Sequence, residues 1–164
     1  MTRYPVVLAI AMLAACGGSS NQDVHAPKDM PFKDMNLAQK TAFMKEVVMP
    51  RSKELFVAFD PKFQDMNCKT CHGDGADDGS FAMPNPKIRP LPSSEEAFMA
   101  WMQKEPDMGK WAGFMAQKLT PAMADMLKMT IHNPKTGQGE FGCTACHTLQ
   151  PAEGAPAPAA PPAG

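Results

Sequence analysis

Apolar residues recur at helical spacing in the segment that begins near residue 36. They fall into two interleaved series, Phe43 with Val47, and Met44 with Val48 and Leu55. Residues 36–39, Asn-Leu-Ala-Gln, have the form of a capping box, in which the first and fourth residues bond to each other's backbone N–H groups. Because Pro50 cannot donate a backbone hydrogen bond, we expect it to kink or restart this helix.

Two further segments carry helix signals. Ser-Ser-Glu-Glu at 93–96 repeats the capping pattern ahead of an apolar run at 97–102, and this helix is expected to end before Pro106. Thr-Pro at 120–121 has the form of the N-cap and first position of another helix. No segment alternates convincingly between apolar and polar residues, so the chain is predicted to be mainly α-helical.

The composition suits one soluble domain or two small ones, with 164 residues of which 44% are apolar and 20% charged. No apolar run reaches the roughly 18 to 20 residues needed to span a bilayer. A formal net charge of −1 gives no electrostatic footprint for nucleic acid, so a nucleic-acid partner is not expected. Fifteen methionines against one tyrosine and two tryptophans predict a core rich in methionine.

The first sixteen residues have the pattern of an export signal, with Arg3 ahead of an apolar stretch at 6–13. Leu-Ala-Ala-Cys at 13–16, followed by Gly-Gly-Ser-Ser, resembles the lipobox of bacterial lipoproteins. The resemblance implies that residues 1–15 are removed and that Cys16 is acylated and anchors the protein to a membrane. A soluble secreted protein whose signal ends near a cysteine is the alternative.

The residue after the acylated cysteine bears on the location. In bacterial lipoproteins an aspartate there favours retention at the inner membrane, whereas this chain has Gly17. The resemblance therefore implies the periplasmic face of a bacterial membrane, with the outer membrane favoured.

The other four cysteines form two pairs, and a histidine follows each pair. The first motif is Cys68-Lys69-Thr70-Cys71-His72, and the second motif is Cys143-Thr144-Ala145-Cys146-His147. Both have the Cys-x-x-Cys-His pattern through which c-type haem is attached. Two thiols must reach the two vinyl groups on one side of the porphyrin while the adjacent imidazole binds the iron, and a helical turn provides this spacing. The sequence predicts two covalent haems, with all four cysteines as attachment residues and both histidines as iron ligands.

Two other uses of cysteine pairs fit less well. A zinc ribbon would place the pairs some 15 to 20 residues apart, whereas 71 residues separate Cys71 from Cys143. A thioredoxin-type dithiol would need no histidine in either place. With Cys16 acylated and four cysteines bound to haem, no thiol is left for a disulfide or for catalysis.

An internal repeat accompanies the two motifs. Residues 43–50 align with residues 114–121 at an offset of 71, and the motifs follow at an offset of 75. The identical pairs are Phe43 with Phe114, Met44 with Met115, and Pro50 with Pro121. The second copy therefore differs from the first by a four-residue insertion in the loop between the helix and the motif.

The order of helix, loop and haem motif resembles multihaem cytochromes c, most closely the cytochrome subunit of photosynthetic reaction centres. The resemblance covers roughly residues 43–72 and 114–147. It implies a small helical cytochrome c with two helix–loop–Cys-x-x-Cys-His units, in which a helix carrying an axial methionine precedes each motif. This chain departs from the pattern in having two haem motifs and longer separations between methionine and cysteine.

Together these signals divide the chain into five parts. They are a signal peptide (1–15), a flexible tether (16–35), a first haem-binding unit (36–92), a second haem-binding unit (93–149) and a disordered tail rich in proline and alanine (150–164). The glycine- and proline-rich segments 73–79, 83–92 and 133–137 are expected to be long loops.

The sixth ligand of each iron decides the function. Because two of the four histidines are proximal ligands and His25 lies in the tether, histidine cannot fill both sixth positions. The repeat offers Met44 and Met115 as equivalent ligands, and a thioether opposite histidine raises the reduction potential. The alternative is that both methionines are core residues. The other candidates are Met49, Met123 and His132.

Two smaller features also allow two interpretations. Pro84 resembles the proline of small class I cytochromes whose carbonyl accepts the Nδ1 proton of the proximal histidine, although a surface loop explains it equally well. Asp74, Asp77 and Asp78 could bind calcium, but their spacing does not match an EF-hand loop and a solvated acidic turn is favoured.

Three functional classes compete. An electron carrier, which we expect, needs two low-spin haems with both axial positions filled, and it works with redox partner proteins rather than as an enzyme. A dihaem peroxidase needs one open iron and polar groups above it, for which the folded part of the chain is short. A haem-based sensor, or a haem subunit of a larger complex, is the third class.

Overall fold

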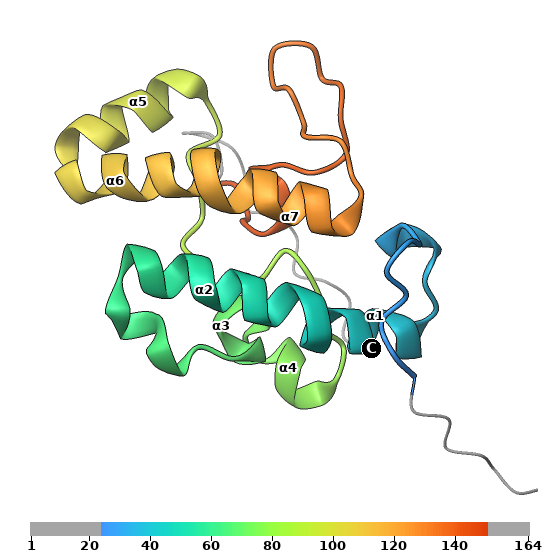
Figure 1. Cartoon of the computed structure of the whole chain (residues 1–164). Coiled ribbons are helices and arrows are strands. Elements are labelled where there is room, and N and C mark those ends of the chain that lie inside the picture. Colours follow the sequence, from blue (N-terminus) through green and yellow to red (C-terminus); the bar gives the residue numbers. More distant parts are fainter. Residues whose placement is uncertain (1–23, 151–164) are drawn as a thin grey trace, which may run out of the picture.

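The computed structural model of the chain describes residues 24–150 and is built around two long helical segments (Figure 1). The first joins α1 (Leu37–Phe43), a π-helical turn (Met44–Val48) and α2 (Met49–Phe59). The second joins α6 (Pro106–Phe114), a π-helical turn (Met115–Leu119) and α7 (Thr120–Leu127). Each segment therefore contains one copy of the sequence repeat.

The capping box predicted for α1 is confirmed. The Asn36 side chain accepts a hydrogen bond from the Gln39 backbone N–H at 2.9 Å, and the Gln39 side chain accepts one from the Asn36 N–H at 2.9 Å. These two bonds satisfy N–H groups that a helix start leaves without partners.

The proline inside each long segment is accommodated by a π-helical turn. Pro50 has no N–H to donate, and its ring crowds the preceding turn. The Met49 N–H bonds back to the Met44 carbonyl, five residues earlier, and the helix then continues through Pro50. The expected kink or restart is thus a local widening of one continuous helix.

The helix predicted through Met123, Met126 and Leu127 is confirmed as α7, but the assignment of Thr120 as its N-cap is wrong. Thr120 has helical dihedral angles of φ −59° and ψ −46°, and its N–H bonds to the Met115 carbonyl. The second segment begins instead at Pro106, whose missing N–H costs nothing at the first position of a helix. Thr120 and Pro121 lie in the helix interior because the π-helical turn accommodates Pro121, as the matching turn accommodates Pro50.

The remaining elements are short, apart from α5 (Glu95–Lys104). Its predicted cap is confirmed, since the Ser94 hydroxyl accepts a hydrogen bond from the Ala97 N–H at 3.1 Å, and it ends before Pro106. The others are α3 (Cys68–His72), α4 (Gly75–Asp78) and the 3₁₀ helices Phe32–Asp34, Pro61–Asp65 and Cys143–Ala145. Residues 24–150 contain isolated β-bridges but no sheet, which confirms the mainly α-helical prediction.

The two long segments pack against each other in opposite directions, and α2 and α7 lie alongside each other in Figure 1. Phe43, early in the first segment, shares a buried cluster with Leu127, at the end of the second. Phe56, late in the first segment, contacts Phe114 of the second, with ring centroids 5.2 Å apart. The repeat therefore builds an antiparallel pair with an approximate twofold relation.

Two core clusters lie at the two ends of this helix pair. The first cluster consists of the buried residues Met35, Phe43, Val48, Ala124, Leu127 and Phe141. The second cluster consists of Phe56, Met66 and Phe114. Each cluster takes residues from both repeats, so the predicted boundary between residues 92 and 93 divides the sequence but not the core.

The last part of the predicted flexible tether (16–35) packs against the core instead of being flexible. Met35 is only 4% exposed in the first cluster, and Met30 and Phe32 pack against that cluster. The predicted signal peptide (1–15), Cys16 and all of the predicted tail except Gln150 lie outside the described residues. No helix within residues 24–150 has the length and apolar character to cross a membrane.

Replacing Phe114 by alanine tests the antiparallel core. The Phe114 ring contacts Phe59 and Trp111 as well as Phe56, with centroids 4.4 and 6.2 Å away, and the residue is 7% exposed. We expect Phe114→Ala to lower the free energy of unfolding of the mature protein by about 3–5 kcal/mol. Denaturant titration followed by circular dichroism measures this. Leu37→Ala, at a residue 75% exposed, is the control and should change stability by less than about 0.5 kcal/mol; equal losses would contradict the assignment.

Candidate cofactor-attachment sites

The first motif occupies α3, a single helical turn with a well-defined start. Asn67 forms a capping box with Thr70, in which the Asn67 N–H donates to the Thr70 hydroxyl at 3.1 Å. The Asn67 side chain also accepts a hydrogen bond from the Lys69 N–H at 3.0 Å. These bonds hold Cys68 and Cys71 on the helical turn that the sequence predicted.

The His72 imidazole is fixed by a backbone carbonyl. Its Nδ1 atom lies 3.1 Å from the Phe81 carbonyl oxygen. Since a carbonyl only accepts, the proton is on Nδ1 and the lone pair is on Nε2, the form that binds a metal ion. Phe81 has a φ of +48°, which is strained for this residue, and its ring meets the imidazole edge-on at 5.4 Å. The suggested acceptor Pro84 is exposed and does not fill this role.

The second motif is also a helical turn, formed by the 3₁₀ helix Cys143–Ala145. The His147 N–H donates to the Cys143 carbonyl at 3.0 Å. The His147 Nδ1 atom lies 2.9 Å from the carbonyl oxygen of Arg89, so Nε2 again carries the lone pair. Arg89 lies in the loop before α5, far from His147 in the sequence.

The side chain of Arg89 is held in place from two sides. Its guanidinium donates two hydrogen bonds to Glu105, of 2.9 and 2.6 Å, and lies over the Trp101 ring at 4.6 Å. The Trp101 Nε1–H donates to the same carboxylate at 2.9 Å. The hydrogen bonds from Arg89 lower the pKa of Glu105. This network fixes the residue whose carbonyl orients His147.

Asn85 joins the two motifs. It is 4% exposed, its side-chain amide donates to the Cys71 carbonyl at 3.0 Å, and its backbone N–H donates to the Cys146 carbonyl at 3.3 Å. Farther along the same loop, the Leu91 N–H donates to the Thr148 carbonyl at 2.9 Å. The loop that follows α4 therefore holds the first motif and lies along the second.

The four motif thiols form no disulfide. Burial raises the pKa of Cys71 to about 11, and the nearby thiols of Cys146 and Cys68 add to this rise. Burial also raises the pKa of Cys146, with Cys143 contributing. Burial thus keeps the Cys71 and Cys146 thiols protonated near neutral pH, and Cys71 lies close enough to Cys146 for their charges to interact.

Each methionine suggested by the repeat packs against the cluster that also contacts a cysteine of the other repeat's motif. Met44 packs against the first cluster, as does Cys146 of the second motif. Met115 packs against the second cluster, as does Cys71 of the first motif. The alternative Met49 packs against the second cluster, and the alternative Met123 packs against the first.

The remaining histidines lie at the surface. His132 is exposed in the turn region before the second motif. Its backbone N–H donates a hydrogen bond to the Phe141 carbonyl at 2.8 Å. His25 lies 3.6 Å from the carboxylate of Glu46 on the first long segment.

The acidic residues after the first motif are engaged locally. Asp74 pairs with Lys87 at 2.6 Å, and Asp77 pairs with Lys69 at 2.7 Å. The Asp78 carboxylate accepts a hydrogen bond from the Ser80 backbone N–H at 2.8 Å, and this bond lowers the pKa of the carboxyl group. Over the described range, no three His, Cys, Asp or Glu side chains gather as a metal-ion site.

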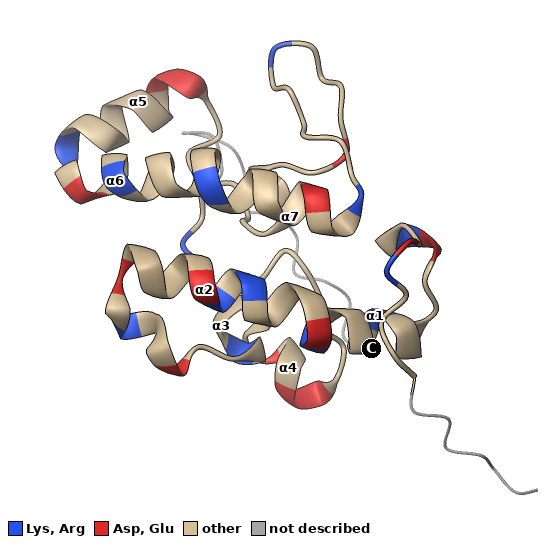
Figure 2. Cartoon of the chain, in the orientation of Figure 1, with Lys and Arg blue, Asp and Glu red and all other residues tan. Residues whose placement is uncertain are grey.

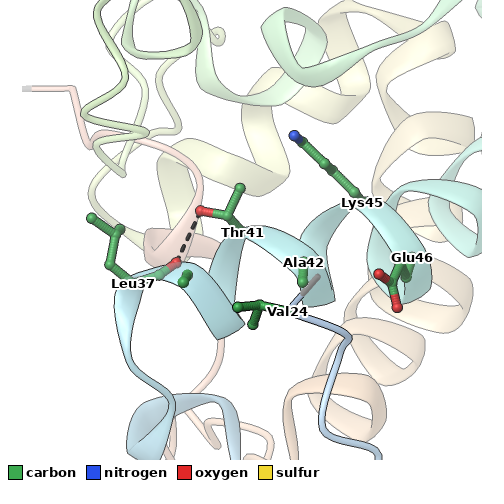
Figure 3. Close-up of a pocket in the computed structure, with 7 residues that line it drawn as sticks. Val24, Leu37, Thr41, Ala42, Lys45 and Glu46 are labelled. Atoms are coloured by element: carbon green, nitrogen blue, oxygen red, sulfur yellow. Dashed lines mark hydrogen bonds between the residues drawn. The ribbon is translucent and has the colours of Figure 1, made fainter. Parts of the chain in front are cut away.

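A shallow surface groove lies on α1, away from both motifs (Figure 3). The segment around Val24 lies over α1 there, next to Leu37, Ala42 and Glu46. The Ala26 N–H donates to the Glu46 carboxylate at 3.1 Å, which attaches the segment to the helix. The groove contains none of the motif cysteines or histidines.

Several of these residues carry no recognisable sequence signal. Phe81, Asn85 and Arg89 act through backbone atoms or at long range, in a loop whose composition predicts only turns. Gly73 was a usable signal, because a glycine directly after the first motif often marks a conformation that other residues avoid.

The donor set fits a c-type haem at each motif. Each motif presents two free thiols and an imidazole on one helical turn. Each imidazole has its Nδ1–H bonded to a carbonyl, which leaves Nε2 as the metal-binding atom.

No protein-family model, curated protein or solved structure matches the chain.

A glycine substitution tests the junction at Asn85. Gly73 has φ +56°, and a Cβ there would lie 2.8 Å from the Asn85 Oδ1 atom. We expect Gly73→Ala to destabilise the protein by at least about 2 kcal/mol and to disturb the first motif. Gly79→Ala is the matched control, because Gly79 also has a positive φ of +78° but has nothing within 4 Å of a Cβ; it should cost about 1 kcal/mol. Denaturant unfolding of both variants measures the difference, and equal costs would argue against a tight contact with Asn85.

Proposed function

We propose that the protein is a dihaem c-type cytochrome that transfers electrons from a membrane-anchored position. The observation that carries the proposal is the matching arrangement of His72 and His147. Each Nδ1 atom is bonded to a backbone carbonyl, and each lone pair is left on Nε2. Histidines that bind a metal ion commonly donate their other ring N–H to a carbonyl in this way, which orients the ring.

The residues that would hold the cofactors are those of the two motifs. The cysteine pairs would form the thioether bonds, and His72 and His147 would be the proximal ligands. A haem bound in this way supplies an iron that accepts and returns one electron. The carbonyls of Phe81 and Arg89 keep the imidazoles in one orientation, which limits reorganisation when the charge on the site changes.

The closeness of the two motifs supports transfer between two centres in one chain. Asn85 bonds to the carbonyls of both Cys71 and Cys146, and these two thiols lie near enough to affect each other's pKa. Cys71 and Cys146 are half-buried and pack against the two apolar clusters, which shield these two attachment points in part from water.

The surface charge fits brief contact with redox partner proteins. Figure 2 shows basic and acidic positions interspersed along α5, α6 and α7 and along the first long segment, with neither sign gathered on one face in this view. Mixed charge of this kind gives weak long-range steering, so association is expected to be short-lived.

Membrane attachment is proposed from the lipobox alone. Cys16 would carry the lipid, and the chain from Gly17 to Val24 would connect the anchor to the segment that lies over α1. Acyl chains on Cys16 would hold the cytochrome on the periplasmic face of the membrane, and the outer membrane is favoured.

The number of covalent haems tests the function. Mature protein made in a host with haem-attachment machinery should carry two haems by intact mass, and the Cys68→Ser/Cys71→Ser variant should carry one. The reduced protein should not bind carbon monoxide, since an electron carrier has both axial positions filled. Wild-type protein that carries no covalent haem would defeat the proposal. Carbon monoxide binding at one haem would favour a peroxidase-like enzyme or a sensor.

Fractionation tests the anchor. Wild-type protein should be found with membranes and should carry acyl chains by mass spectrometry, whereas Cys16→Ala should be released or remain unprocessed. Wild-type protein that is soluble in the periplasm and free of acyl chains would contradict the lipobox assignment and leave the haem proposal intact.

A further inference from the structure

We infer that the two repeats exchange their sixth-position ligands, so that Met115 serves the iron held by His72 and Met44 serves the iron held by His147. The inference rests on the proposed function, because it requires a haem at each motif. It differs from the arrangement implied by the sequence resemblance, in which each methionine serves the motif that follows it.

The repeat selects this pair of methionines. At the offset of 71 that relates the two long helical segments, Met44 corresponds to Met115. Met49, the nearest alternative, corresponds to Thr120, which has no thioether. The same position of the repeat therefore supplies a methionine to both sites only if Met44 and Met115 are the ligands.

The antiparallel packing decides which motif each methionine can serve. Met115 and Cys71 pack against the same second cluster, although they belong to different repeats. Met44 and Cys146 pack against the same first cluster, and they too belong to different repeats. The antiparallel packing of the helices thus places each methionine against the same apolar cluster as a cysteine of the other motif.

The backbone at both methionines has the same unusual form. Each begins a π-helical turn, and its carbonyl accepts a hydrogen bond from the residue five positions later. Turns of this kind inside α-helices are frequent at functional sites. Both side chains are half-buried, so their sulfur atoms are not enclosed within the core.

The main competitor at the second motif has its sulfur atom engaged elsewhere. The Sδ atom of Met123 accepts a hydrogen bond from the hydroxyl of Ser52 at 3.6 Å, and Ser52 is buried with 4% exposure. Ser52 is also the position that the repeat relates to Met123, so no second methionine completes a symmetric pair. Met123 therefore fits a role in joining the two helices.

One-haem variants of the full chain test the exchange. In Cys143→Ser/Cys146→Ser, which keeps the first motif, Met115→Ala should abolish the near-infrared sulfur-to-iron charge-transfer band, and Met44→Ala should leave it at full strength. In Cys68→Ser/Cys71→Ser, which keeps the second motif, the two effects should be reversed. Met99→Ala is the control for loss of a methionine, because Met99 is 48% exposed on α5 and lies outside both clusters.

The opposite pattern, with Met44→Ala abolishing the band of the first motif, would overturn the exchange and restore the arrangement implied by the sequence. Loss of the bands only in Met49→Ala and Met123→Ala would also overturn it. These outcomes differ from failure of the proposed function, in which wild-type protein carries no covalent haem at all.

Nuclear magnetic resonance of the intact two-haem protein gives a second test that does not depend on the one-haem variants folding. With methionine methyl groups labelled and assigned by single substitutions, the Met115 methyl should show contacts with the haem bonded to Cys71. The Met44 methyl should show contacts with the haem bonded to Cys146. Contacts in the reverse combination would overturn the inference.

Discussion

The antiparallel packing of the two long helical segments is the constraint on which the rest of the structure depends. It places Phe43 with Leu127 at one end and Phe56 with Phe114 at the other. Neither repeat can bury its apolar face without the other, because each core cluster takes residues from both. The matching π-helical turns allow both helices to continue past their prolines and reach the far end of their partner.

A single loop adds what the helices do not provide. The segment between α4 and α5 supplies the Phe81 carbonyl to His72 and the Arg89 carbonyl to His147, and it places Asn85 between the two motifs. The helices therefore follow the approximate twofold relation, whereas the supports of the two imidazoles do not. One carbonyl belongs to a residue with strained backbone, and the other belongs to a residue whose side chain is clamped by Glu105 and Trp101.

The sequence predicted features that depend on neighbouring residues and missed those that depend on distant ones. The caps at Asn36 and Ser94 are local hydrogen bonds, so their patterns were sufficient. Thr120 was misassigned because the rule for proline at a helix start does not anticipate a π-helical turn that accommodates proline in the interior. The equivalence of Met44 and Met115 could be predicted from the repeat, but their positions relative to the motifs could not, since these follow from helix packing. Asn85 and Arg89 act on groups far along the chain, which no local pattern encodes.

The bonds between residue 91 and the last described residues have a consequence for the order in which the protein can mature. The Leu91 N–H bonds to the Thr148 carbonyl, and the Gln150 N–H bonds to the Leu91 carbonyl at 2.7 Å. A chain that emerges with its N-terminus first exposes the first motif well before these partners exist. The loop beside that motif must wait for residues 148–150 to arrive, so its native contacts form only after the second motif has been made. Newly made chains therefore pass through a stage in which the loop beside the first motif lacks these two backbone hydrogen bonds.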